Sequence, residues 1–279
     1  MPSINLATKY ASKLDQLFTA GSYTDRYVNK KYDFTGAKTV EVYTATTVDP
    51  TNYNRNGSSD RFGGNNELED TLTAYTIAND KCFKIAIDRG NYEQGALAKK
   101  AGEVMRAEME EKVIPMIDAN RLLKAAIGAA AVSQYYAPTA NHAYEDVLKL
   151  SADLDEAKAP QANRALFVTP AFYNAIKAQI TTTILGSGYN DKLLGRGFVG
   201  ELDGVPVVKV PSSYFPSNTS AIMIHKDALL GVSQIKTTRI KTDSEFVDGS
   251  ILLGRFVYDT FVLNGKKNAV AAIGTGSLS

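Results

Sequence analysis

Residue types that most often carry catalysis or bind metals are scarce in this sequence. It contains two histidines, His142 and His225, and one cysteine, Cys82. The two histidines lie far apart in the chain, and no cysteine or other histidine stands near either of them, which argues against a zinc site. Cys82 can form no intramolecular disulfide, and its place in the strand-like run KCFKIAI favours a packed thiol over a reactive one. The residues therefore predict no metal site and no catalytic histidine or cysteine.

One pattern resembles a phosphate-binding loop. Gly195, Gly197 and Gly200 match G-x-G-x-x-G. The dinucleotide fingerprint needs a strand before it and a helix after it, so that the helix N-terminus meets the pyrophosphate. Here the loop is followed by ELDGVPVVKV, which reads as a turn and a strand. A flexible glycine loop is the interpretation favoured by this context, and a nucleotide-binding enzyme that uses residues 195–200 stays open as an alternative.

Paired carboxylates give no stronger indication of catalysis. Asp153, Asp155 and Glu156 fall on the polar face of a predicted helix. A solvated helix face explains them without an acid and base pair. The sequence thus predicts no catalytic residue, no cofactor and no enzyme.

Composition sets the outer limits on function. The chain has 279 residues, of which 44% are hydrophobic and 22% charged, so it has enough material for a core. Its 31 basic and 30 acidic residues leave a net charge of +1, which excludes a strong global attraction to nucleic acid or to an anionic membrane. The N-terminus lacks the apolar run of a signal peptide, and the best apolar run, residues 125–132, is too short to span a bilayer. No membrane partner is expected.

The first half of the chain contains elements that look unable to fold alone. Residues 4–18 carry one apolar helical stripe, and residues 39–48 and 71–88 read as two long strands of a hairpin. Between these strands lies the polar stretch 52–69, longer than a compact domain keeps without a use for it. A helical pattern then runs through Met105 and Met109, which are expected to face a sheet, and should kink or restart at Pro115.

The second half reads as mixed α/β and then as strands. Residues 143–157 and 170–180 predict helices, residues 164–170 predict a strand, and residues 200–211 predict a tight hairpin that turns at Asp203-Gly204. The last third is rich in strand patterns. An arm, a long two-stranded loop and an overlong helix all offer surface to a partner, which is typical of a subunit whose stability comes from assembly.

The order of these elements, and several stretches of sequence, resemble the major capsid proteins of tailed bacteriophages, which have the Hong Kong 97 fold. Short stretches of the sequence are similar to those of capsid proteins from phages and prophages of low-GC Gram-positive bacteria. The stretches are INLATKYASKLDQLFTAGSYTD (4–25), YDFTGAKTVEVYT (32–44), EEKVIPMIDANRLLKAAIGA (110–129), ALFVTPAFYNAI (165–176) and GELDGVPVVKVP (200–211). No single motif among them is diagnostic, because this family shares architecture more than sequence.

The resemblance implies an α+β fold with four parts. Residues 1–36 would form an N-terminal arm and residues 37–90 an extended hairpin, the E-loop. Residues 91–135, a long spine helix, and residues 228–279 would build a peripheral domain, and residues 136–227 an axial α/β domain. Some relatives crosslink the E-loop covalently through Lys and Asn. The tip at 52–69 holds Asn52, Asn54, Asn56, Asn65 and Asn66 but no Lys, and spacing shows no partner, so the crosslink is not carried over to this chain.

The resemblance also implies the function. The chain would assemble with itself, as hexamers and pentamers, into an icosahedral phage head around double-stranded DNA, which it would contact weakly and without specificity. Portal and scaffolding proteins would be its other partners, the virion capsid its location, and the bacterial host cytoplasm its place of assembly. Residues 52–69 would form the E-loop tip that lies over an adjacent subunit. Within it we expect Arg55, Arg61 and Phe62 to make the contacts, because arginine and aromatic side chains anchor interfaces.

Two further functions were weighed at the level of sequence, and one of them stays open. A shell subunit of a cargo-enclosing, encapsulin-like bacterial nanocompartment would share the fold, and its packaged content would be protein instead of nucleic acid. A surface adhesin or tail component is disfavoured, since the sequence shows neither an export signal nor repeated β modules.

Overall fold

The computed structural model describes residues 21–32, 34, 38–45, 47–57, 61–63, 70–88, 101–134, 142–185, 200–244 and 247–274. The chain forms two compact units: the smaller comprises Lys31–Ile77, and the larger comprises Met1–Lys30 with Ala78–Ser279. Predictions for the arm helix at 4–18, for the start of the spine helix at 91–100 and for the glycine loop at 195–199 lie outside the described residues.

The smaller unit contains a two-stranded antiparallel ribbon. Strands β1 (Thr39–Ala45) and β2 (Asp70–Thr76) pair from Thr39 opposite Thr76 to Ala45 opposite Asp70. Here the sequence prediction of one strand over 71–88 is wrong, because the run divides between Ile77 and Ala78. Ile77 donates its backbone N–H to the Lys38 carbonyl at 2.9 Å within the smaller unit, whereas Ala78 donates to the Asp259 carboxylate at 2.9 Å within the larger one. The backbone therefore changes its pairing partner after Ile77, although the alternation of side chains continues without a break.

The larger unit holds the remaining described elements. Its helices are α2 (Ala101–Glu108), α3 (Ile114–Gly128), α4 (Ala143–Glu156) and α5 (Pro170–Leu185), with short 3-10 turns at η1 (Asp25–Tyr27), η4 (Ser212–Tyr214) and η5 (Asn264–Ala269). Its strands are β3 (Asn79–Asp88), β4 (Ala131–Gln134), β5 (Arg164–Val168), β6 (Glu201–Leu202), β7 (Val205–Lys209), β8 (Thr219–His225), β9 (Leu229–Ser244), β10 (Val247–Val262) and β11 (Val270–Gly274).

The spine of this unit is one helix with an irregular middle. Between α2 and α3 lies a π-helical turn, η3 (Met109–Val113), in which the Ile114 N–H donates to the Met109 carbonyl five residues back. Pro115 follows directly and has no N–H to continue the α-helical ladder, so a wider turn before it passes the proline without breaking the helix. A kink or restart was predicted at Pro115; the structure has a π turn over Met109–Val113, and α3 begins at Ile114 directly before the proline.

The spine ends earlier than its sequence suggests. Residues up to 135 were expected to be helical, but α3 ends at Gly128 and residues 131–134 form β4, parallel to β11. Alanines dominate this stretch and favour helix on their own. Pairing begins at Ala130, which donates its N–H to the Val270 carbonyl at 3.2 Å. Tertiary pairing thus overrides local propensity.

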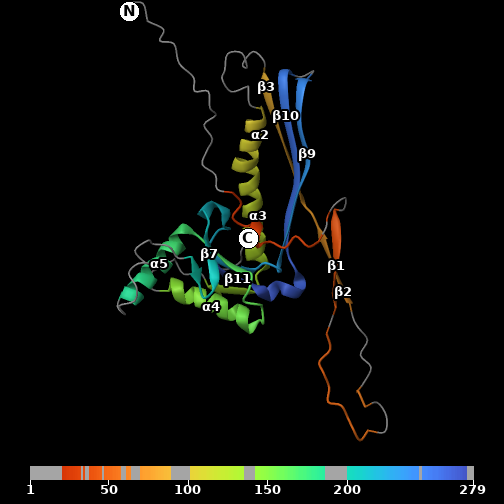
Figure 1. Ribbon diagram of the computed structural model, residues 1–279, viewed down its shortest axis with the longest axis vertical. Coiled ribbons are helices and arrows are strands. Elements are labelled where there is room, and N and C mark those ends of the chain that lie inside the picture. The colour runs from red at the N-terminus through yellow and green to blue at the C-terminus, as the bar shows by residue number, and fades with distance from the viewer. Residues whose placement is uncertain are drawn as a thin grey trace, which may run out of the picture. The chain divides into compact units, whose positions relative to one another are not determined.

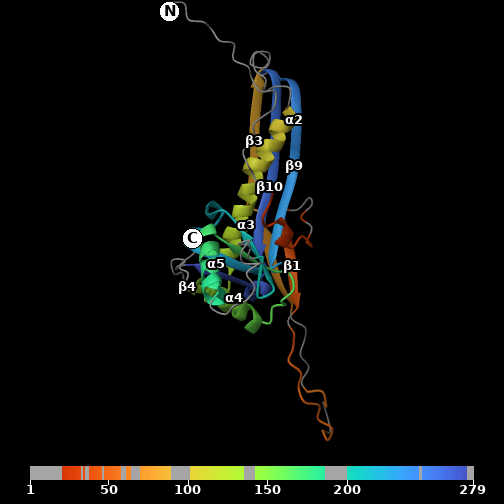
Figure 2. The ribbon, with the colours of Figure 1, turned by 60° about the vertical axis from the view of Figure 1, so that its left-hand side comes forward.

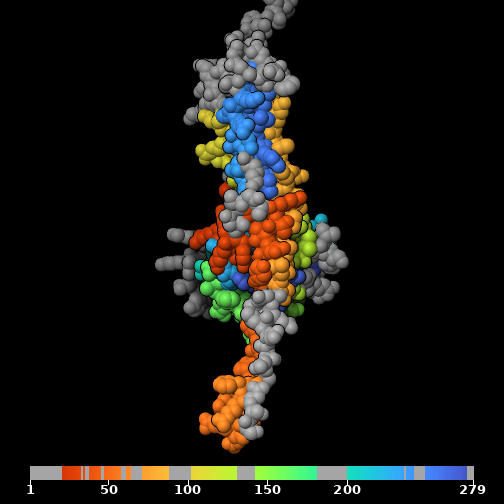
Figure 3. Space-filling view, turned by 90° about the vertical axis from the view of Figure 1, so that its right-hand side faces the viewer, coloured from red at the N-terminus to blue at the C-terminus, as the bar shows by residue number. Residues whose placement is uncertain are grey.

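A three-stranded antiparallel sheet in the order β3-β10-β9 packs against the spine. Figures 1 and 2 show α2 running along one face of these strands, and Figure 3 shows their opposite face. Phe256 and Tyr258 of β10 are buried together with Val113 of the spine. Gly254 lies opposite Phe83 of β3, and a Cβ on Gly254 would collide with the Phe83 ring, so the glycine makes room for an aromatic side chain across the strands.

Cys82 is exposed, so the prediction of a packed thiol is wrong. Successive strand residues point to opposite faces, and Phe83, its neighbour in β3, packs toward the spine. Cys82 pairs with Arg255 of β10 on the face away from the helix.

The second sheet has six strands in the order β4-β11-β8-β5-β7-β6 and is covered on both faces. One face packs on α4 and α5, with Leu150 and Ile176 in its core, and the other packs on α3 through Leu122 and Ala126. Every residue of β5, β8 and β11 is buried, as expected for strands between two helical layers.

The hairpin that closes this sheet is formed as predicted. Leu202 of β6 pairs with Val205 of β7. Between them Asp203 and Gly204 have φ of 52° and 71°, the positive values that a two-residue type I′ turn requires.

Candidate assembly surfaces

The three predicted contact residues all lie on the loop tip, which we define as described residues 51–57 and 61–63. Arg55 and Arg61 are exposed, and Phe62 exposes 83% of its surface. The two sides of the tip are joined to each other. Asn54 donates its N–H to the Arg61 carbonyl at 3.0 Å, and the Thr51 hydroxyl donates to the Phe62 carbonyl at 3.2 Å. The tip is therefore a folded turn rather than a structureless stretch.

Two aromatic side chains of this turn contact each other. The rings of Tyr53 and Phe62 meet edge to face, with centroids 5.0 Å apart and planes at 67°. Tyr53, which sequence reasoning did not choose as a contact residue, exposes 49% of its surface. The sequence contained evidence that Tyr53 could be a contact residue, because Tyr53 and Phe62 are two of the few apolar residues in an otherwise polar loop. Two exposed aromatic rings held together by backbone hydrogen bonds are suited to enter a partner's pocket.

In the larger unit, residues 22–24 are fastened to the spine by a buried carboxylate. Asp118 of α3 is 1% exposed. It accepts hydrogen bonds from the Ser22 hydroxyl at 2.6 Å, the Tyr23 N–H at 2.7 Å and the Thr24 hydroxyl at 2.5 Å. Three donors from consecutive residues satisfy one carboxylate, so the chain between Ser22 and Thr24 is fixed against the helix.

Arg121, one helical turn further along α3, completes this anchor. Its side chain is 2% exposed and donates to the Thr24 hydroxyl and to the Asp25 carboxylate, each at 3.1 Å, while lying 3.6 Å from Asp118. Burial raises the pKa of Asp25, but the hydrogen bond from Lys30 and the charges of Arg121 and Lys30 outweigh it, so this pKa lies below its usual value. The remaining Arg121 donor, Nε, is buried and has no hydrogen-bond partner among the described residues.

A second fastening follows a few residues later. Asn29 donates its N–H to the Leu229 carbonyl at 2.8 Å and accepts from the Gly231 N–H at 3.1 Å, so it pairs with the start of β9. Val28 is buried beside Gly231, where a Cβ would come within 3.0 Å of the Val28 side chain. Residues 22–29 are therefore fixed to both α3 and the start of β9.

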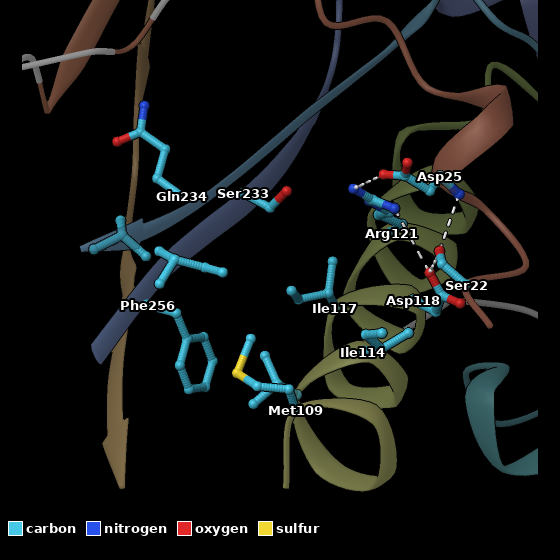
Figure 4. Close-up of a pocket in the computed structure, with 13 residues that line it drawn as sticks. Ser22, Asp25, Met109, Ile114, Ile117, Asp118, Arg121, Ser233, Gln234 and Phe256 are labelled. Atoms are coloured by element: carbon cyan, nitrogen blue, oxygen red, sulfur yellow. Dashed lines mark hydrogen bonds and ion pairs between the residues drawn. The ribbon is translucent and has the colours of Figure 1, made fainter. Parts of the chain in front are cut away.

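Next to the anchor lies a cavity of about 370 Å³ between the spine and the sheet, which we call the anchor cavity. Figure 4 shows the spine residues on one side, Phe256 and Gln234 on the other, and the Arg121 network at one end. Its lining residues are Ser22, Asp25, Met109, Val113, Ile114, Ile117, Asp118, Arg121, Ser233, Gln234, Ile235, Phe256 and Val257. Ile235 of β9 exposes 61% of its surface, although it lines the cavity. The cavity thus has apolar walls and one charged end.

The other residues considered for chemistry are not brought together. His225 is buried at the end of β8, where desolvation lowers its pKa, and its Nδ1 accepts from the Asp227 N–H at 3.2 Å. Asp155 is not merely solvated, because it accepts a hydrogen bond from the buried Arg164 at 2.7 Å. Gly200, the one described member of the glycine pattern, is followed by β6 rather than by a helix. This following strand lacks the helix N-terminus that a dinucleotide site needs.

Metal ligands and membrane spans were also sought within the described part of the chain. Its histidine, cysteine and acidic side chains form no group of three or more that would hold a metal ion. None of its helices combines the length and apolar character needed to cross a bilayer.

Comparison with known proteins identifies the family. A family model described as phage capsid protein matches residues 85–273. A search of curated protein sequences found no significant match. Among solved structures, a chain from Mycobacterium phage Che8 aligns with a TM-score of 0.73 at 18% identity, covering 96% of this chain and 97% of that one. The capsid structure of cyanophage P-SCSP1u aligns with a TM-score of 0.76 at 12% identity, covering 98% and 93%. The mature capsid of bacteriophage PhiM1 gives 0.72 at 12% identity, covering 99% and 93%.

These similarities bear out the predicted α+β capsid fold and give no support to a nanocompartment shell or to a nucleotide-binding enzyme. The family is structural and not enzymatic. Because its model covers well over half of the sequence, the chain belongs to the phage capsid protein family, as a major capsid protein that assembles with itself into the shell of a phage head.

Proposed function

We propose that copies of this chain form the hexamers and pentamers of an icosahedral tailed-phage head, and that the loop tip clasps a neighbouring copy. The observation that carries the clasp is the Tyr53–Phe62 ring pair, exposed to solvent on a turn that is tied by its own backbone. Exposing two aromatic rings costs hydration free energy unless a partner covers them. Arg55, Arg61 and Phe62 are the residues we assign to the contact.

The division of the chain into an arm at 1–36, an E-loop at 37–90, a peripheral domain at 91–135 and 228–279, and an axial domain at 136–227 belongs to the same proposal. The compactness of Lys31–Ile77 supports a separate loop region. That unit ends before residue 90, because β3 belongs to the same sheet as β9 and β10. Strands β4 and β11, which the proposed bounds assign to the peripheral domain, lie in the six-stranded sheet. The three-stranded sheet and α2 therefore form the core of the proposed peripheral domain.

Double-stranded DNA, portal and scaffolding proteins are the proposed partners, with assembly in the host cytoplasm. A net charge of +1 supports only weak, unspecific contact with packaged DNA, since tight binding relies on many lysine or arginine contacts to phosphate. Nuclease-protected nucleic acid inside purified particles would separate this proposal from a protein-filled compartment. A proteinaceous cargo without nucleic acid would contradict it.

Deletion of residues 55–66 tests the clasp. Shortening an exposed loop changes closure entropy by only about 0.6 kcal/mol per halving of its length, so the subunit should keep its circular dichroism and soluble yield. Its shells should fail to form or should fall apart in electron micrographs. Intact, stable particles from the deletion variant would refute the clasp, and an unfolded subunit would show that the loop belongs to the core.

A length-preserving variant separates side chains from chain length. Replacing Arg55, Arg61 and Phe62 together by Ser keeps the loop length and removes the proposed contacts, together with the hydrogen bond that Arg61 Nε donates to the Gly57 carbonyl at 3.2 Å. We expect the same loss of particles as for the deletion. Normal particles from this triple variant would place the contact elsewhere on the loop.

A further inference from the structure

We infer that Asn56 and Gly57 of the loop tip form a site of spontaneous deamidation, which converts Asn56 of a free subunit to aspartate or isoaspartate and weakens that subunit in assembly. The sequence contains two Asn-Gly pairs, Asn56–Gly57 and Asn264–Gly265. The site itself is inferred from the geometry of the tip. Its effect on assembly rests on the proposed clasp, because the tip must bind a neighbour for a change in it to matter.

The reaction needs no reagent other than water. The Gly57 nitrogen bonds to the side-chain amide carbon of Asn56 and closes a succinimide ring. The side-chain NH₂ group leaves as ammonia and takes up the proton of the Gly57 N–H. Water then opens the ring at either carbonyl, which gives aspartate or isoaspartate. Glycine favours this attack, because it has no Cβ to obstruct ring closure and its backbone is free to turn.

The backbone of the tip leaves the attacking nitrogen loosely held. Asn56 is exposed, so water reaches its side chain. The Gly57 N–H donates to the Asn54 carbonyl at 3.5 Å, which is at the long limit for a hydrogen bond. Asn56 donates its own N–H to the Asn54 side-chain oxygen at 3.2 Å. The turn therefore keeps Asn56 in place, whereas the Gly57 nitrogen can leave its carbonyl partner at little cost.

Positive charge near this peptide favours the reaction further. Arg61 donates from Nε to the Gly57 carbonyl at 3.2 Å, and Arg55 directly precedes Asn56 in the chain. Ring closure places negative charge first on the Gly57 nitrogen and then on the former side-chain oxygen of Asn56. Cations held close to a developing negative charge stabilise it, so the two arginines should lower the barrier to ring closure.

The second Asn-Gly pair is a matched control within the same chain. Asn264 and Gly265 are also exposed, but they begin the 3-10 turn η5. Within this turn the Lys266 N–H donates to the Leu263 carbonyl at 2.8 Å. The bond spans both residues of the pair and fixes their backbone dihedrals. The Gly265 nitrogen therefore cannot turn toward the Asn264 side chain unless the bond breaks, and we expect this pair to react more slowly.

Deamidation would change the surface that the clasp uses. Either product adds a negative charge beside Arg55 and Arg61, two of the proposed contact residues. Isoaspartate also routes the backbone through the former side chain and so lengthens it by one methylene between Asn56 and Gly57. The turn that holds the Tyr53–Phe62 ring pair would then lose its register.

Peptide mass spectrometry tests the site. Purified subunits, shown to be monomeric by sedimentation, are incubated in mildly alkaline buffer and digested at intervals. The peptide with Asn56 should gain the mass difference between OH and NH₂ severalfold faster than the peptide with Asn264. In guanidinium chloride the two rates should become similar, because the fold no longer separates the pairs. Equal rates in the folded subunit, or a difference that persists in the unfolded chain, would overturn the inference.

Substitutions test the chemistry and its effect. Gly57→Ala should slow deamidation of Asn56 severalfold and leave Asn264 unchanged. Asn56→Asp, which has the charge of the product, should give fewer particles than Asn56→Gln, which keeps an amide. If these two variants assembled equally well while deletion of residues 55–66 abolished shells, the clasp would stand and the effect of deamidation would be overturned. Intact shells from the deletion variant would refute the clasp instead, and mass spectrometry would still decide the site.

Discussion

At the scale of single residues, the pair Asp118 and Arg121 stands out in the larger unit because both charged side chains are buried together. The carboxylate of Asp118 satisfies three donors from the arm, and the guanidinium of Arg121 is almost completely buried beside it. Neither charge is stable there alone, because an uncompensated buried charge cannot recover its lost hydration. Removing either charge should therefore weaken the attachment of residues 22–25 to α3.

Asp118→Ala should lower the free energy of unfolding by about 3–5 kcal/mol, the usual effect of removing one partner of a buried ion pair. Urea unfolding of the purified subunit measures this change. Glu156→Gln at the exposed end of α4 is the control, and it should stay within about 0.5 kcal/mol of wild type. A loss below 1 kcal/mol for Asp118→Ala would show that the arm anchor does not contribute to folding.

His225 gives the subunit a pH dependence of known sign. Desolvation lowers its pKa in the folded state below the unfolded value of about 6.5, so the unfolded chain binds the proton more readily. Its contribution to stability is therefore present above pH 6.5 and is lost as the pH falls toward the folded-state pKa. His225→Asn should flatten the fall in unfolding free energy just below pH 6.5. An unchanged slope in denaturant titrations at several pH values would contradict this assignment.

At the scale of elements, the packing of the spine on the three-stranded sheet supports the prediction from helical periodicity that Met109 faces the sheet. Met109 packs at the cluster of Val113, Phe256 and Tyr258, and Figure 4 shows its side chain beside the Phe256 ring. Met105 is half-buried on α2. The π turn that begins at Met109 shifts the phase of the helix before Pro115, and such a shift cannot be foreseen from spacing alone.

Met109→Asp would place an unpaired charge against aromatic rings and should cost several kcal/mol of unfolding free energy. Met109→Leu conserves volume and apolar character and should cost less than about 1.5 kcal/mol. Thermal unfolding of both variants and of the wild-type protein measures these differences in stability. If the aspartate variant melted like wild type, Met109 would not face the sheet.

Gly254 is the second test of this interface. Gly254→Ala places a Cβ into the Phe83 ring and should destabilise the subunit by about 1–3 kcal/mol. The additional change Phe83→Ala removes the collision, so Gly254→Ala should then cost much less than it does alone. Gly102→Ala in α2, where a Cβ meets nothing within 4 Å, should instead stabilise by about 0.5–1 kcal/mol. Equal effects at both glycines would contradict the role of Gly254.

Sequence patterns were most successful for elements whose local and tertiary preferences agree. The helices α4 and α5, strand β5 and the Asp203-Gly204 turn lie where periodicity and turn chemistry place them. The patterns failed where a backbone partner decides the outcome. The division after Ile77 depends on two acceptors far away in the chain, and β4 depends on β11.

The candidate site was predicted only in part for the same reason. Arg55, Arg61 and Phe62 were expected to contact a neighbouring subunit. They are exposed on the loop tip, and the contact itself stays a prediction. The Tyr53–Phe62 ring pair and the anchor cavity require contacts between residues that no short-range pattern relates, because the cavity combines the arm, the spine and the strands β9 and β10.

At the scale of the whole molecule, the subunit presents parts that are suited to contact with another copy. Its loop tip exposes a paired Tyr53 and Phe62. Residues 22–29 are fastened both to α3 and to the start of β9, and the spine borders a cavity with apolar walls. Membership of the phage capsid family explains why a chain with few catalytic residue types carries such parts. We therefore expect assembly to cover these surfaces.

Imaging of the purified wild-type protein by electron cryomicroscopy, across a range of protein and salt concentrations, tests this account most directly. The account predicts closed icosahedral shells or their hexamers and pentamers, with density for residues 51–63 of each copy lying on the adjacent copy. A population that remains a compact monomer under every condition, or shells in which the loop tip contacts no neighbour, would contradict it.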